Sequence, residues 1–149
     1  MKRFLVKGFH LYSRFSRGLT GGARVFASHG DDVLLVRHSY TKGLSLPGGG
    51  VEVGETFDEA AVKELREEAE LTPTAPLMLF GLYLNRLVTE RDHVAVYVCR
   101  EFEWNGFTPT REILDARFHP LGDLPADVTE PTRRRIAEIV ESRRPDPYW

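Results

Sequence analysis

Glutamates are concentrated in one stretch of this 149-residue chain, directly after a run of three glycines. The loop "LPGGG" (46–50) leads into a segment with six glutamates, at positions 55, 59, 64, 67, 68 and 70. Successive helical residues are rotated by about 100°, so Glu64, Glu67 and Glu68 would share an arc of roughly 100°. Such a trio either faces solvent or holds a hard cation such as Mg²⁺, which selects oxygen ligands.

The neighbours of these glutamates favour the cation site. Phe57, Ala60 and Ala61 would fall on the same arc, so the trio would continue a partly buried strip. It would lie toward the helix C-terminus, where the backbone dipole disfavours carboxylates. Like charges four residues apart also cost about 0.2–0.5 kcal/mol per pair. A divalent cation would reverse both penalties, and the preceding glycines would let backbone groups approach an ion or phosphate closely.

The elements around this stretch predict a mixed sheet covered by helices. Turn signals and apolar patterns predict strands over 21–28, 32–39, 76–87, 92–104 and 112–121. A capping box formed by Thr56 and Glu59 begins a helix that runs to about Ala69. Thr129 opens a final helix with an apolar stripe. We expect the following tail, residues 143–149, to be extended and loosely held.

Composition and charge narrow the class of protein. The net charge is −2, but residues 1–20 alone carry +5, from Lys2, Arg3, Lys7, Arg14 and Arg17. We predict that this basic segment packs on its own domain, in preference to a membrane surface, a polyanion or a neighbouring subunit. The acidic remainder argues against binding long nucleic acid. No apolar run is long enough to span a membrane, and the single cysteine forms no internal disulfide, so we expect a cytoplasmic protein.

The glycine–glutamate stretch resembles the Nudix box, the signature of the Nudix hydrolases, from Gly49 to Leu71. The matching positions are Gly49, Glu55, Lys63-Glu64-Leu65, Glu67-Glu68 and Glu70-Leu71. Two residues depart from the pattern: Lys63 replaces the box arginine, and Glu70 replaces the glycine that closes the helix. The resemblance implies an α/β/α sandwich with a mixed β-sheet over residues 21–142, between the basic segment 1–20 and the tail.

The resemblance also implies roles for individual residues. Glu64, Glu67 and Glu68 match the metal-binding and catalytic glutamates, and the Gly48 carbonyl matches a further metal ligand. Glu112 is our candidate for a catalytic carboxylate outside the box, with Asp115 a weaker one. Supporting or substrate-binding roles fall to four box residues: Gly49, Glu52, Glu55 and Lys63. Arg37, at a predicted strand end near the glycine loop, is a candidate for binding a substrate phosphate.

The implied reaction is hydrolysis of the diphosphate bond in a nucleoside diphosphate linked to another group. Mg²⁺ or Mn²⁺ would be the cofactor, the substrate would be a small nucleotide-type molecule, and a homodimer is the family-level expectation. The residue pattern leaves the general base open among Glu64, Glu68 and Glu112. A nucleotide-binding sensor with a weakened box is the alternative. An isoprenoid diphosphate isomerase ranks last, because the only cysteine, Cys99, lies in mid-strand.

Overall fold

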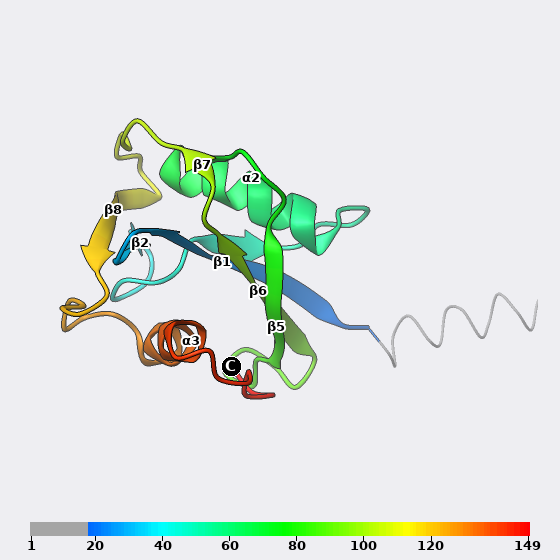
Figure 1. Ribbon diagram of the computed structural model, residues 1–149. Coiled ribbons are helices and arrows are strands. Elements are labelled where there is room, and N and C mark those ends of the chain that lie inside the picture. Colours follow the sequence, from blue (N-terminus) through cyan, green and yellow to red (C-terminus); the bar gives the residue numbers. More distant parts are fainter. Residues whose placement is uncertain (1–17) are drawn as a thin grey trace, which may run out of the picture.

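Strand β1 (Thr20–His29) occupies the centre of a mixed sheet in the computed structural model, which describes residues 18–149 (Figure 1). The strand order is β5-β6-β1-β2-β8, and β3 also pairs with β1. β1 and β6 are parallel, and the other pairs are antiparallel. The remaining strands of the sheet are β2 (Asp32–His38), β3 (Gly48–Gly50), β5 (Met78–Leu84), β6 (Asp92–Cys99) and β8 (Ile113–Pro120).

Two helices cover the opposite faces of this sheet, α2 (Phe57–Ala69) and α3 (Glu130–Val140) (Figure 1). Alternate residues of β1 serve the two layers: Val25 packs in the core beneath α2, and Phe26 packs in the core beneath α3. β6 divides in the same way, with Tyr97 and Val98 on different sides. The predicted α/β/α sandwich with a mixed sheet is therefore confirmed.

The box helix α2 begins as the sequence predicts. The Thr56 hydroxyl accepts from the Glu59 backbone N–H, and the Glu59 carboxylate accepts from the Thr56 N–H, which completes the capping box. The helix ends at Glu70, which adopts the left-handed conformation with φ 52° and ψ 30°. Its side chain accepts a hydrogen bond of 3.1 Å from the Thr108 N–H. Glutamate thus takes the left-handed position that glycine usually fills at a helix end.

We expect Glu70→Gly to be more stable than Glu70→Ala by about 1 kcal/mol. A residue with a Cβ costs roughly 1–2 kcal/mol in the left-handed conformation. This cost is larger than the free-energy cost of the extra backbone entropy that glycine loses on folding. Both variants lose the contact with Thr108, so their difference isolates the backbone. Urea denaturation of the two proteins measures it. If alanine were the more stable, as it is inside helices, the left-handed geometry at this position would be refuted.

The strand predicted over 92–104 is interrupted. β6 ends at Cys99, and β7 (Phe102–Glu103) leaves the main sheet to pair with β4 (Thr72–Pro73). A two-residue strand that contains proline is too short to show an alternating pattern, so β4 gave no signal in the sequence. The pair places Trp104 beside the end of α2, where its indole N–H donates to the Ala69 carbonyl at 2.9 Å.

The expectation of a loosely held tail is wrong. The Leu84 N–H donates to the Pro147 carbonyl at 2.8 Å, and the Trp149 N–H donates to the Leu84 carbonyl at 3.1 Å. The tail therefore pairs with the end of β5, which is an edge strand of the sheet. Exposed ends of chains are loose unless such backbone bonds hold them, and the sequence pattern did not reveal the partner strand.

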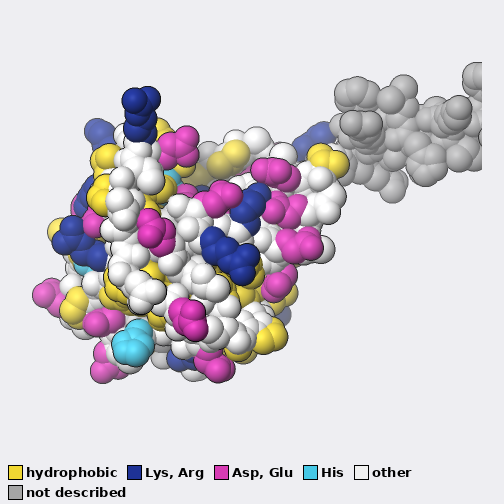
Figure 2. Space-filling view, turned by 90° about the horizontal axis from the view of Figure 1, so that it is seen from above, with side chains coloured by type: hydrophobic (Ala, Val, Ile, Leu, Met, Phe, Trp, Pro, Cys, Tyr) yellow, Lys and Arg dark blue, Asp and Glu magenta, His cyan; other side chains and the backbone are white. Residues whose placement is uncertain are grey.

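The sequence also led to predictions about the basic N-terminal segment, membrane spans and nucleic-acid binding. The basic segment lies almost entirely in residues 1–17, outside the described residues. Within residues 18–149, none of the helices is long and apolar enough to cross a bilayer. On the face over α2, acidic and basic side chains are intermixed and do not form a continuous basic surface (Figure 2).

Candidate active site

Glu68 is the buried centre of the box, with only 7% of its surface exposed. One carboxylate oxygen accepts from the Gly48 N–H at 2.8 Å, and the other lies 2.5 Å from His38 Nε2. These contacts join α2 to strands β2 and β3. Buried carboxylates need such partners, so the strands fix the orientation of this side chain.

Gly48 can make this contact only because it lacks a side chain. Its φ is +151°, and a Cβ there would overlap with the Ala23 carbonyl of β1. The Gly48 carbonyl in turn accepts from the Arg24 guanidinium. The oxygen that we predicted as a metal ligand therefore already has a donor from β1.

Glu64 lies one helical turn before Glu68, against the glycine strand. A Cβ on Gly49 would overlap with its carboxylate, so glycine is required at that position. Within residues 18–149, no hydrogen-bond donor contacts the Glu64 carboxylate. Burial, reinforced by the charges of Glu68 and Glu67, raises the pKa of Glu64 to about 7. Burial and the two neighbouring carboxylates thus disfavour the ionised form of Glu64.

The remaining predicted carboxylates, Glu67 and Glu112, are exposed to solvent. Glu67 lies on α2, and Glu112 lies just before β8. Tyr40 lies just after β2, and its ring centroid is 5.1 Å from that of His38. Partial desolvation raises the pKa of Tyr40, and the charge of Glu68 is the next cause. The charges of Glu112 and Glu64 act in the same direction, so both carboxylates lie near Tyr40.

Lys63 holds the loop that precedes the box helix. Its ammonium lies 2.9 Å from Glu55 and 3.4 Å from Glu52. The Glu55 carboxylate also accepts from the Glu52 N–H at 2.9 Å, which is the main reason its pKa is lowered. Lys63 therefore links this loop to α2 through ion pairs, although lysine lacks the bidentate fork of an arginine.

The structure does not bring Arg37 to the glutamates. Side chains alternate along a strand, so Arg37 and His38 of β2 point to opposite faces of the sheet. His38 faces α2 and contacts Glu68, whereas Arg37 pairs with Asp127 at 2.7 Å. This guanidinium lowers the pKa of Asp127. The sequence placed Arg37 near the glycine loop but could not fix which face it occupies.

The glutamate oxygens of the box are ligands of the kind that Mg²⁺ selects. Within the described part of the chain, no group of three or more acidic, histidine or cysteine side chains is arranged so that it could hold a metal ion by itself. Mg²⁺ is usually held by one or two carboxylates together with waters and substrate phosphates, so a complete cage is unnecessary. No donor among the described residues contacts the Glu64 carboxylate, and the Glu67 side chain is exposed to solvent. The Glu68 carboxylate is held in one orientation by its two partners. These side chains would hold the metal.

We expect the metal-free protein to lose stability as the pH rises from 4.5, the ordinary pKa of a glutamate, to about 7, the raised pKa of Glu64. The folded state binds the Glu64 proton more tightly than the unfolded chain, so this stabilisation is present at low pH and is lost above the raised pKa. Solvent screening at a half-buried site limits the effect to about 1–2 kcal/mol. Urea denaturation in EDTA at about pH 5 and about pH 8 measures it.

Glu64→Gln is the matched control for this pH dependence, because it keeps the shape and cannot ionise. At the higher pH we expect the variant to be more stable than the unchanged protein, and at the lower pH the difference should shrink. Equal stability of the two proteins at both pH values would contradict the raised pKa.

A cavity of about 350 Å³ opens between the end of β2, the loop that follows it and the start of α3, and the box glutamates are not part of its lining. Its lining includes Arg24, His38, Tyr40, Lys42, Leu87 and Trp149. Arg24 and His38 are the lining residues that contact Gly48 and Glu68. The cavity thus combines cationic side chains near the glutamates with apolar surface from Leu87 and Trp149.

The sequence pattern did not predict site roles for Arg24, His38, Tyr40 and Trp149. Arg24 lies within an ordinary strand pattern, and Trp149 is far from the box in sequence. The only available signal for His38 and Tyr40 was their position at, or directly after, the end of the predicted strand 32–39. Trp104, by contrast, packs at 5.0 Å on Phe118 and is not among the cavity lining.

Comparison with known proteins places this geometry in a family. A family model of the NUDIX domain matches residues 18–139. The chain belongs to the Nudix family. The matched range includes the box glutamates, the glycine strand β3 and all but the last residue of helix α3.

A protein from Methanocaldococcus jannaschii named ADP-ribose pyrophosphatase is similar to part of this Nudix chain. The two are 46% identical over 83 residues, which make up 55% of this chain and 48% of that protein. The chain therefore spans about half the length of this curated relative.

Solved structures show that the Nudix fold extends over most of the chain. The MutT NUDIX hydrolase from Burkholderia pseudomallei gives a TM-score of 0.70 at 20% identity, over 80% of this chain and 97% of that one. An ADP-ribose pyrophosphatase from Streptococcus suis gives 0.64 at 24% identity, over 87% and 96%. At these identities the similarity shows the fold alone.

Proposed function

We propose that this chain is a divalent-metal-dependent pyrophosphohydrolase that cleaves a nucleoside diphosphate linked to another group. The observation that carries the proposal is the crowding of Glu64 against Glu68 and Glu67, beside a cavity that contains Arg24 and Lys42. Carboxylates alone would repel a diphosphate, whereas cationic side chains would attract it. The similarity to the ADP-ribose pyrophosphatase from Methanocaldococcus jannaschii supports the same reaction class.

When bound, Mg²⁺ or Mn²⁺ would neutralise the glutamates, polarise phosphate oxygens and lower the pKa of a water molecule. The chain's own residues supply position and charge. His38 and the Gly48 N–H fix Glu68, while Arg24 fixes the Gly48 carbonyl from the opposite side. Lys42 and Tyr40 lie on the cavity wall, where they can contact substrate phosphates.

The general base is one of three carboxylates that lie near Tyr40, namely Glu64, Glu68 and Glu112. Glu68 already accepts from two donors, so its lone pairs are partly committed. Glu64 and Glu112 retain more freedom to accept a proton from water. Their contributions can be separated by comparing the Gln variants of these two positions.

The sensor alternative is less well supported. It rested on Lys63 and Glu70 as marks of a weakened box. Lys63 contacts both Glu55 and Glu52, and Glu70 closes the helix in the left-handed conformation that the box requires. Both departures therefore preserve the local geometry, which favours an active enzyme.

The test is hydrolysis of a substrate panel by purified protein with Mg²⁺ or Mn²⁺. The panel comprises nucleoside diphosphate sugars including ADP-ribose, dinucleoside polyphosphates and nucleoside triphosphates. We expect metal-dependent release of a nucleoside monophosphate from at least one diphosphate-linked compound, and no turnover in EDTA. Tight binding without turnover of any compound would support the sensor instead. A homodimer and a cytoplasmic location remain predictions from the sequence.

A further inference from the structure

The tail carries an aromatic ring to the cavity of the proposed active site. Trp149 lines that cavity, although it follows the end of α3 by nine residues. Its ring packs edge-on against Tyr83 of β5, with centroids 5.8 Å apart. The indole is half-buried, so part of it remains available to a ligand.

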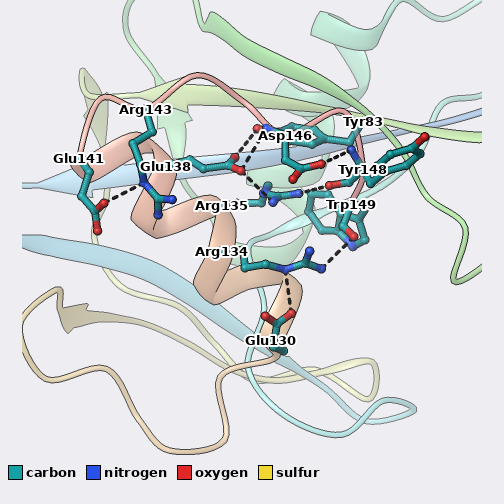
Figure 3. Close-up of polar contacts among 10 residues, drawn as sticks. All are labelled: Tyr83, Glu130, Arg134, Arg135, Glu138, Glu141, Arg143, Asp146, Tyr148 and Trp149. Atoms are coloured by element: carbon teal, nitrogen blue, oxygen red, sulfur yellow. Dashed lines mark hydrogen bonds and ion pairs between the residues drawn. The ribbon is translucent and has the colours of Figure 1, made fainter.

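Two arginines of α3 hold the tail by its backbone. Arg135 donates to the Tyr148 carbonyl at 2.8 Å, and Arg134 donates to the Trp149 carbonyl at 2.9 Å. The Arg135 guanidinium also lies 4.3 Å above the Tyr83 ring and 5.6 Å from the Trp149 ring. Figure 3 shows these side chains projecting from α3 toward the tail.

Arg135 is completely buried, which is unusual for an arginine. Its carboxylate partner, Glu138, lies 3.0 Å away and also accepts from Tyr83 and from the Asp146 N–H (Figure 3). The Arg135 Nε finds no partner among the described residues. A buried ion pair contributes little net stability, but it fixes the groups that bond to it in one arrangement. Here those groups are the tail backbone and Tyr83.

We propose that Trp149 is a specificity-determining residue, and that Arg135 and Glu138 are positioning residues that hold it at the cavity. The inference rests on the proposed function and assigns a planar nucleobase to this part of the cavity. Aromatic side chains bind bases by stacking, which is worth roughly 1–3 kcal/mol per base and tolerates different bases. The diphosphate would then extend past Arg24 toward the glutamates.

The first test uses the presence of only two tryptophans in the chain. In Trp104→Phe, the fluorescence comes from Trp149, and in Trp149→Phe it comes from Trp104. Each protein is titrated with AMP, GMP, UMP and CMP, and with ribose 5-phosphate, which lacks a base. We expect at least one nucleotide to quench Trp149 and leave Trp104 unchanged, with no quenching by ribose 5-phosphate. Failure of all four nucleotides, or equal quenching by ribose 5-phosphate, would overturn the proposal.

The second test measures binding of the same ligands by calorimetry. Trp149→Ala should weaken the quenching nucleotide about tenfold and leave ribose 5-phosphate within about twofold. Arg135→Leu combined with Glu138→Leu should show the same selective loss, because the ring loses its support. A merely structural role would weaken both ligands equally, and that result would refute the assignment.

These outcomes are separable from the proposed function. A protein that binds nucleotides through Trp149 but hydrolyses no member of the substrate panel would refute the hydrolase and retain this inference. A protein that hydrolyses the panel but discriminates no base through Trp149 would do the reverse.

Discussion

Glu68→Gln is expected to lower kcat/KM by at least ~10³-fold, or about 4 kcal/mol of transition-state stabilisation, while the protein stays folded. The carboxylate accepts from the Gly48 N–H and contacts His38, so both of its oxygens are engaged. An amide keeps only one acceptor and presents donors to one of these groups. It also removes a negative charge that a divalent ion would require. Steady-state hydrolysis with Mg²⁺, together with circular dichroism, measures the effect.

Glu64→Gln should cause a loss of similar size for a different reason. Its carboxylate has no donor to lose in the described structure, so only the charge and the metal-binding oxygen change. Activity and stability together therefore distinguish loss of a catalytic group from loss of folded structure. Both variants lose activity, but the free energy of unfolding of Glu64→Gln increases at high pH.

Glu70→Gln is the control for both variants, because it removes the same charge from the end of the same helix. Its side chain faces Thr108 and lies outside the cluster, so activity should change by less than about twofold. Unchanged kinetics in Glu64→Gln and Glu68→Gln would remove the box from the mechanism.

The second large effect concerns stability. We expect Arg135→Leu to reduce the free energy of unfolding by about 3–5 kcal/mol, because it leaves the Glu138 carboxylate buried without its cation. Adding Glu138→Leu should recover part of the loss, since the apolar pair carries no unpaired charge but leaves the buried Tyr83 hydroxyl without its acceptor. Urea denaturation of both variants gives the comparison.

Arg134→Ala provides the control, because this arginine also bonds the tail backbone but pairs with Glu130 at an exposed site. An exposed pair contributes about 0–1 kcal/mol, so this variant should remain close to the unchanged protein. If Arg135→Leu were equally mild, the buried pair would not hold the tail.

The local elements of this fold could be predicted from the sequence because their signals lie within a few residues. The capping box of Thr56 and Glu59 and the alternation of β6 both appear in the structure as the pattern indicates. Where one element depends on a distant partner, prediction failed. β4 and the docking of the tail both depend on strands that are far away in sequence.

The candidate site divides in the same way. Helical periodicity alone placed Glu64, Glu67 and Glu68 on one arc, and their crowding follows from that spacing. The pattern could not show that His38 would face Glu68 while Arg37 pairs with Asp127. A shift of one residue along a strand moves a side chain to the opposite face of the sheet. The sequence does not define strand boundaries to within one residue, so it could not assign these faces.

The sequence by itself determined the family resemblance, the order of helices and strands, and the glutamate cluster, because all three depend on short-range spacing. Only the tertiary structure decided which distant side chains share one cavity: Arg24 from β1, His38 from the end of β2, Tyr40 from the loop that follows and Trp149 from the tail. Contacts between distant segments depend on how whole layers pack, and a buried group such as Arg135 finds its partners only after that packing is complete.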